Sequence, residues 1–390
     1  MNKFSIDLEK LNELNGSKSV AFFNYIKNVT KNRTQVVLKG QKVDDYWLCD
    51  VYECATPTSK FFGIKLPAGQ DPNKNGTPLI VALSTKLMPF ILESGSTFMF
   101  DENRVTIKKG TLKMQEAYEI SPSEIEESLE QFARTHDNQE PVTSSITIGN
   151  ESDIFHFMEN TSNLEAFFYI EGGKITYRED SFFFRTPVTE SVEGNDKIFI
   201  NVYTATKIGN ILSYCEKVKL SLTERFTILQ GYIGEEEIVK NISSVFEATE
   251  ENPTDEDLAS ISPSAETNSQ SITLETEEFF SCFGEYMRNM QSFMDLKKAV
   301  FHLYKNGEGL SVGLRNGDQG RIANFNIGTV EVEEPEEEAF SQWSVVIPLS
   351  TIKNIVDGLT TITLEFDDSD DTAVLIKSGD RTCLSGKLFG

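Results

Sequence analysis

Apolar residues recur along this chain in a strand, helix, strand pattern that appears three times. The clearest copy covers residues 343–366, where a β-rich run gives way to Ser350, a good helix N-cap. The apolar positions after it are spaced i, i+3, i+4 and i+7, which is typical of one helix face: Ile352, Ile355, Val356 and Leu359. The period then changes to alternation, which predicts a strand through Ile362, Leu364 and Phe366.

Two earlier stretches, 79–102 and 199–222, repeat this order. The second copy matches the third at every offset, with a helical stripe and an alternating strand at Ile208, Ile211, Leu212, Cys215, Val218, Leu220 and Leu222. In the first copy Pro89 interrupts the helix unless the helix begins late enough to place proline in its first turn. The stripes begin at residues 88, 208 and 352, so the repeating unit has the size of a domain.

The repeat predicts three domains, at 1–120, 145–246 and 271–390, and 390 residues exceed what one core usually serves. Each domain is predicted to be α+β, with two helices packed on antiparallel strands. Residues 121–144 begin as an acidic helix and end in a polar stretch, so they are interpreted as an acidic connector. Residues 247–270 are rich in acid, Pro, Ser and Thr, and such a linker cannot bury enough apolar surface to offset its ordering entropy.

The first helix of each domain is predicted from apolar spacing as well, at 19–30, 151–163 and 277–294. The opening residues 3–8 alternate in hydrophobicity and predict a strand. Strands are expected to make up most of the remaining chain, so each domain should contain more strand than helix.

Composition narrows the class of protein. No apolar run approaches the roughly 20 residues that cross a bilayer, and the amino terminus lacks the apolar segment of a secretory signal, so a cytoplasmic location is predicted. Five cysteines without paired C-x-x-C spacing favour buried, reduced thiols over disulfides or a zinc site. The net charge of −25 argues at first sight against nucleic acid as a partner, yet a mean charge can hide a basic face.

The threefold order resembles the bacterial-type sliding clamp, the processivity factor of replicative DNA polymerases, or a divergent phage or viral version of it. PLSTIKNIVDGL at 348–359 looks like the second helix of a clamp domain, and FSIDLEKL at 4–11 looks like the opening of the family. The resemblance covers nearly the whole chain. It implies a head-to-tail homodimer: a closed ring of six similar domains, with sheets outside and twelve helices around duplex DNA, that tethers a polymerase.

The resemblance also implies non-sequence-specific contacts between helix cations and phosphates. The candidate DNA-binding residues are Lys27, Lys31, Arg33, Lys86, Lys207, Arg288, Lys297, Lys298 and Lys353. For any single lysine, an ordinary solvated helix position is an equally good interpretation. The predicted helix 151–163 departs from the pattern, because it carries three acids and offers only His156 as a cation.

In the clamp family, polymerase and clamp loader insert short peptides with apolar anchors into a pocket between the second and third domains. The matching positions here are Phe182, Phe183, Ala373, Val374, Cys383, Leu384, Ser385, Gly386, Lys387 and Leu388. A buried strand is an equally good interpretation of 182–184. The carboxy terminus GKLFG differs from the usual ending of the family.

Catalysis has little support in the sequence. The three histidines form no recognisable motif, and DDSDD at 367–371 lacks the Gly and closing Glu of a calcium loop, so no enzyme activity, metal or cofactor is predicted. Two alternatives to the clamp remain: a clamp-fold regulatory protein that binds partners through acidic surfaces without encircling DNA, and, more weakly, a nuclease that uses clustered acids.

Overall fold

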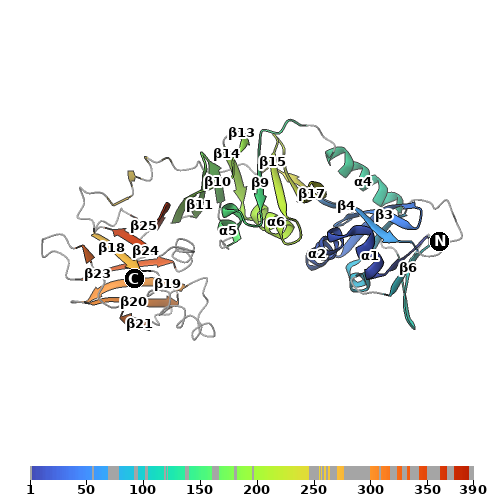
Figure 1. Ribbon diagram of the computed structural model, residues 1–390, viewed down its shortest axis with the longest axis horizontal. Helices are drawn as coiled ribbons and strands as arrows, with labels where there is room; N and C mark the ends of the chain where they lie inside the picture. Colours follow the sequence, from blue (N-terminus) through green and yellow to red (C-terminus); the bar gives the residue numbers. More distant parts are fainter. Residues whose placement is uncertain are drawn as a thin grey trace. The chain divides into compact units, whose positions relative to one another are not determined.

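The computed structural model describes residues 2–390 apart from 55–56, 69–78, 92–94, 102–103, 118–119, 121, 137–139, 160–166, 180–181, 196, 246–253, 255, 257–258, 261, 264–269, 276–298, 307–308, 317–322, 327–331, 334–341, 349–360, 367–372 and 386–390. The chain divides into two compact units. Figure 1 labels their helices and strands. Unit 1 contains Met1–Phe155, Glu190–Asn195 and Thr204–Phe246, and unit 2 contains the rest. No helix among the described residues is long and apolar enough to cross a membrane.

Unit 1 contains two antiparallel sheets. The nine-stranded sheet has the order β13-β9-β15-β16-β17-β4-β3-β2-β5, and the four-stranded sheet has the order β1-β6-β7-β8. The bounds are β1 Asn2–Ile6, β2 Gln35–Val43, β3 Tyr46–Tyr52, β4 Ser59–Pro67, β5 Leu79–Ser84, β6 Ser96–Phe100, β7 Arg104–Lys109, β8 Leu112–Ala117, β9 Ser144–Gly149, β13 Glu193–Gly194, β15 Lys217–Leu222, β16 Phe226–Ile233 and β17 Glu236–Ser244.

Unit 2 also contains one nine-stranded and one four-stranded antiparallel sheet, with the orders β14-β10-β11-β12-β26-β25-β24-β18-β22 and β21-β20-β19-β23. The bounds are β10 Phe167–Glu171, β11 Lys174–Glu179, β12 Phe182–Pro187, β14 Lys197–Asn201, β18 Gln270–Glu275, β19 Ala299–Asn306, β20 Gly309–Asn316, β21 Ala323–Asn326, β22 Val332–Glu333, β23 Gln342–Pro348, β24 Thr361–Phe366, β25 Val374–Ser378 and β26 Arg381–Ser385. The predicted α+β class is confirmed.

The described helices are α1 Leu8–Asn15, α2 Ser17–Asn32, the 3₁₀ turn η1 Thr85–Leu87, α3 Met88–Ile91, α4 Pro122–His136, α5 Asp153–Glu159 and α6 Val202–Leu212. The predicted helix at 19–30 is confirmed as part of α2, and Pro89 does lie in the first turn of its helix, α3. The prediction of a strand through Leu8 was wrong at its end. Asp7 caps α1 there, because its carboxylate accepts hydrogen bonds from the amides of Glu9 and Lys10.

Parts of the repeat lie outside the described residues. In the third copy the flanking strands are confirmed as β23 and β24, while the helix predicted between them falls in 349–360, outside the described residues. The predicted helix 277–294 also lies outside them, and α5 confirms the described part of the helix predicted at 151–163. The predicted domain boundaries stay a prediction.

Both faces of the sheet in the first domain are covered. Strand register places Leu38 beside Val51, and Val51 beside Phe61, on one face of the sheet. The rings of Phe22 and Tyr25 on α2 pack against Phe61, with centroids 5.7 and 5.4 Å away. Helix α2 therefore covers this face.

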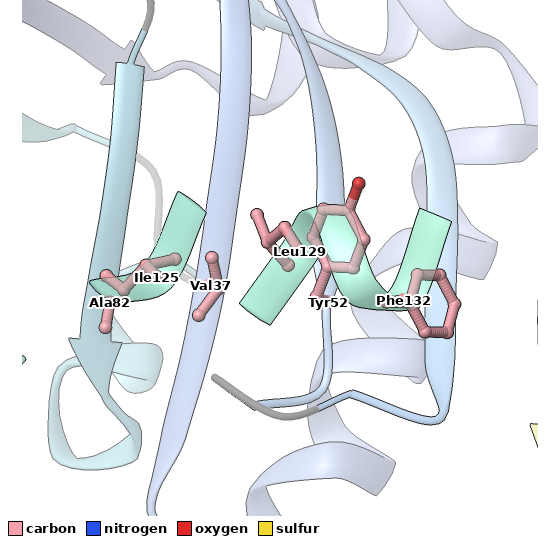
Figure 2. Close-up of a cluster of buried hydrophobic side chains, with 6 residues drawn as sticks. All are labelled: Val37, Tyr52, Ala82, Ile125, Leu129 and Phe132. Carbon is pink, nitrogen blue, oxygen red and sulfur yellow. The ribbon is translucent and has the colours of Figure 1, made fainter. Parts of the chain in front are cut away.

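Helix α4 covers the opposite face. Val37 lies beside Tyr52 on β3 and Ala82 on β5, and these three residues pack against α4 (Figure 2). The helix contributes residues spaced i, i+4 and i+7, Ile125, Leu129 and Phe132, which is the stripe of an amphipathic helix. The acidic connector is thus a helix that packs on the first domain, which explains why three consecutive residues of β2, 36–38, are all buried.

Three of the four cysteines in the described residues are buried thiols, as the sequence predicts, and Cys282 lies outside those residues. Cys49, Cys54, Cys215 and Cys383 form no disulfide with one another, and three of the four are buried. Burial raises the pKa of Cys215 to about 12 and that of Cys383 well above its ordinary value. The thiol of Cys215 packs against Gly231, which has no side chain. A Cβ atom at position 231 would lie only 2.6 Å from Sγ of Cys215.

Replacing Leu129 with Ala should destabilise unit 1 by about 2–4 kcal/mol, because a fully buried leucine loses its contacts and leaves a cavity. Urea unfolding measures the loss of unfolding free energy. It is carried out in a Trp343→Phe background, so that Trp47 of unit 1 is the only tryptophan and its fluorescence follows that unit alone. Glu127→Ala, on the exposed side of the same helix, is the matched control. Equal midpoints for the two variants would contradict the packing of α4.

Iodoacetamide at pH 8 should modify Cys54 in the folded chain while it leaves Cys215 unmodified. A pKa of about 12 leaves roughly 1 in 10,000 thiols of Cys215 ionised at that pH, and the thiolate is the nucleophile. Peptide mass spectrometry reads the outcome, and the urea-unfolded chain, in which every thiol should react, is the control. Rapid labelling of Cys215 in the folded chain would show that it is accessible.

Candidate functional site

Three of the predicted DNA-binding lysines are exposed. Lys27 and Lys31 stand four residues apart on α2, so they lie on the same side of the helix. Lys31 is in the last turn, where a cation suits the helix dipole. Lys86 is exposed in η1, whose first turn is capped by the Ser84 hydroxyl. Because they are exposed, these side chains can approach a polyanion.

Arg33 lies at the C-cap of α2 and is already engaged within the protein. Its Nη2 atom is 3.2 Å from Oε1 of Glu53, a carboxylate whose side chain is only 13% exposed. The same Oε1 atom accepts hydrogen bonds from the amide and the hydroxyl of Thr58, at 3.0 and 2.6 Å. Part of the Arg33 charge is therefore neutralised locally.

Lys207 differs from the exposed lysines. It is half-buried on α6, and its Nζ donates a hydrogen bond to Oδ1 of Asn241 on β17, 3.1 Å away. Burial lowers the pKa of Lys207, and the negative charge of Glu53 acts in the opposite direction. The sequence pattern gave no sign of this environment, because Asn241 and Glu53 are both distant along the chain.

The other predicted cations fall outside the described residues: Arg288, Lys297, Lys298 and Lys353. For His156 the backbone is described within α5, but its side chain is not.

Strand register brings together most of the positions predicted for the peptide pocket. Strand β26 lies between β12 and β25. Ser385 on β26 pairs with Phe182 on one side and Val374 on the other, and Leu384 pairs with Phe183 and Leu375 in the same way. These positions come from segments about 200 residues apart in the chain. Gly386, Lys387 and Leu388 lie outside the described residues.

The predicted pocket residues divide between the two faces of this sheet. Val374 and Cys383 are fully buried on one face. On the other face Ala373, Leu375 and Leu384 form a small apolar cluster, each between 3% and 8% exposed. Leu375 was missed by the sequence analysis, although its two-residue spacing from Ala373 is the signal that could have found it.

Among the described residues, no group of three or more His, Cys, Asp or Glu side chains could hold a metal ion. The acidic run at 367–371 lies outside them. The described part of the chain therefore offers cations and apolar strand positions as its candidate functional groups.

Comparison with known proteins gives similarity in structure only. No family model and no curated protein sequence matches the chain. Solved structures of bacterial clamps match over 100% of both chains. They include the DNA polymerase III β subunit of Borrelia burgdorferi, at 12% identity and a TM-score of 0.64, and that of Pseudomonas aeruginosa, at 10% and 0.63. The β clamp of Helicobacter pylori, solved with a DNA ligase peptide, matches at 11% and 0.60. The chain therefore has the fold of the bacterial β sliding clamp.

Proposed function

We propose that the chain is a DNA sliding clamp, which encircles duplex DNA as a homodimeric ring and tethers a replicative DNA polymerase for processive synthesis. The observation that carries the proposal is a threefold repeat of sheet order along the whole chain. The clamp fold over the full length supports the same function. The protein would act without catalysis, in the cytoplasm.

Each predicted domain contributes two four-stranded sheets with the same internal order. The first sheets are β5-β2-β3-β4, β14-β10-β11-β12 and β23-β19-β20-β21, and the second are β1-β6-β7-β8, β9-β15-β16-β17 and β18-β24-β25-β26. Two backbone joints connect successive domains, β4 with β17 and β12 with β26. In each joint the last strand of a first sheet pairs with the last strand of the next domain's second sheet.

Two strands in the positions that form these joints have no such partner in the described sheets. They are β21, the last strand of the first sheet of the third predicted domain, and β8, the last strand of the second sheet of the first predicted domain. Both are outer strands of their sheets among the described strands, so each presents backbone groups for a further strand. Strand β8 also exposes Leu112 and Met114, 47% and 37% accessible. We infer that β21 of one copy pairs with β8 of a second copy, and that two copies close a head-to-tail ring.

DNA contact would come from exposed lysines such as Lys27, Lys31 and Lys86. Such side chains attract phosphates without reading bases, which suits a ring that has to slide. A chain with a net charge of −25 would repel DNA over most of its surface, so the attraction would stay loose.

The polymerase and the clamp loader would bind through short peptides. The H. pylori clamp holds a DNA ligase peptide, which supports this mode of binding for the fold. Here we place the peptide beside the neighbouring strands β12, β26 and β25, where most of the predicted pocket positions lie.

Replacing Leu112 and Met114 together with Glu should convert a dimer into a monomer, because four carboxylates would be buried at the two joints of the ring. Thermal stability should change little, since both side chains are exposed within the chain. Sedimentation at micromolar concentration measures the mass. Val142→Glu, at another exposed apolar residue, is the control. A wild-type monomer, or a double variant that stays dimeric, contradicts the ring.

Replacing Lys27, Lys31 and Lys86 together with Glu should lower retention on primed circular DNA and the processivity of the cognate polymerase. Attraction to phosphate becomes repulsion, while exposed lysines contribute little to folding. Gel filtration of loaded circles measures retention, and Lys108, Lys174 and Lys197, also exposed, give a triple control variant.

Wild-type protein should be released when the loaded circle is cut, since a ring slides off free ends. Absence of any effect of the wild-type protein on processivity would remove the clamp function. The acidic regulatory alternative would then gain support, because α4 presents four exposed glutamates, Glu124, Glu126, Glu127 and Glu130.

A further inference from the structure

The joint between β4 and β17 depends on more than backbone pairing. Its register covers Val239 with Phe61, Lys240 with Lys60 and Asn241 with Ser59, a shorter run than the pairings of β3 with β4 and β16 with β17 on either side. One additional backbone bond, from the Ile242 amide to the Thr58 carbonyl, extends it. Side chains must therefore supply part of what holds these strands together.

Glu53 is the central acceptor on the β4 side of the joint. It follows β3, and its largely buried carboxylate binds Arg33 from the end of α2 and both polar groups of Thr58, the residue just before β4. A buried carboxylate requires such partners, because it has lost most of its hydration. Glu53 thereby fixes the start of β4 relative to α2.

Lys207 is the matching charge on the β17 side. It reaches from α6 to Asn241, which is itself 5% exposed and lies directly opposite Ser59 in the joint. Burial disfavours the ammonium form of Lys207, the charge of Glu53 favours it, and the positive charge of Arg33 opposes it. Lys207 and Glu53 therefore bind residues that are neighbours in the joint, since Asn241 lies opposite Ser59 and Thr58 directly precedes Ser59.

The helices on either side meet at the same place. The ring of Tyr25 on α2 contacts that of Tyr214, just after α6, edge to face at 6.2 Å. The Asn28 amide lies 3.4 Å from the Ser213 hydroxyl. Movement of α6 relative to α2 would break the Tyr25–Tyr214 and Asn28–Ser213 contacts at the same time. We therefore expect these contacts to open together with the strand pairing.

We propose that Glu53 and Lys207 form a charged latch that sets how readily β4 separates from β17. Lys207 is then a positioning residue of the joint and differs in role from the exposed Lys86. The latch concerns the folded chain alone, so it holds whether or not the protein encircles DNA. Its failure and the failure of the clamp function are separate outcomes.

A double-mutant cycle measured by hydrogen exchange tests the latch. Glu53→Gln keeps an oxygen acceptor for Thr58 and removes mainly charge. Lys207→Met keeps the apolar stem but removes both the charge and the donor to Asn241. Each single variant should speed exchange of the β4 and β17 joint amides by about tenfold, which corresponds to about 1.4 kcal/mol of local opening free energy. In the double variant the exchange rate should increase by much less than the product of the two single-variant increases. Either single change already removes the interaction between Glu53 and Lys207, so the second change cannot remove it again.

Lys86→Met is the matched control and should leave joint exchange unchanged. Lys207→Gln, a milder change that keeps a donor for Asn241, supplies the cycle if Lys207→Met does not fold. Strictly multiplicative effects of the two changes would overturn the latch. So would an unchanged rate at the joint amides, or equal acceleration of the β6–β7 amides, which lie in the other sheet of the unit.

Discussion

Backbone pairing across domain boundaries is the constraint on which this structure depends. A four-stranded sheet leaves two edges with unsatisfied amides and carbonyls, and each exposed edge invites association. The chain satisfies such edges by joining sheets of successive domains, β4 to β17 in one unit and β12 to β26 in the other. The predicted domains are therefore not structurally independent, because each nine-stranded sheet contains strands from two of them.

Covering both faces of a sheet is the second requirement. Strand β2 buries three consecutive residues, which is possible only when apolar groups pack on both sides. Helix α2 supplies one side and α4 the other. Helix α4 contacts the sheet with three apolar residues and exposes its acidic side to solvent. The same segment therefore connects two predicted domains and covers one face of the sheet.

Local pattern predicted much of this fold. The spacing of Ile208, Ile211 and Leu212 predicted α6, and the alternation from Val218 predicted β15. The apolar stripe of α4 was also visible in the sequence. The strands that it covers, β2, β3 and β5, could not be identified from it, because they lie 30 or more residues earlier in the chain. Helix α1 was missed because six alternating residues outweighed the capping signal of Asp7.

The candidate site was predictable only in part, and for a physical reason. Lys86 and Lys207 occupy similar places in the repeat, yet one is exposed and the other is half-buried beside Asn241. The charge of a side chain can be read from the sequence, whereas its burial depends on which distant residues pack against it in the fold. The peptide-pocket positions came from the family resemblance, and strand register shows only that most of them lie on neighbouring strands.

The charge distribution also bears on how a clamp of this composition would hold DNA. With a net charge of −25 and acidic residues along α4, long-range forces oppose association with a polyanion. If Lys207 and Arg33 are engaged at the joint, fewer cations remain to offset this repulsion locally. Under the proposed function, retention on DNA would then depend on closure of the ring more than on affinity. The strength of the joints would thus matter more than the number of phosphate contacts.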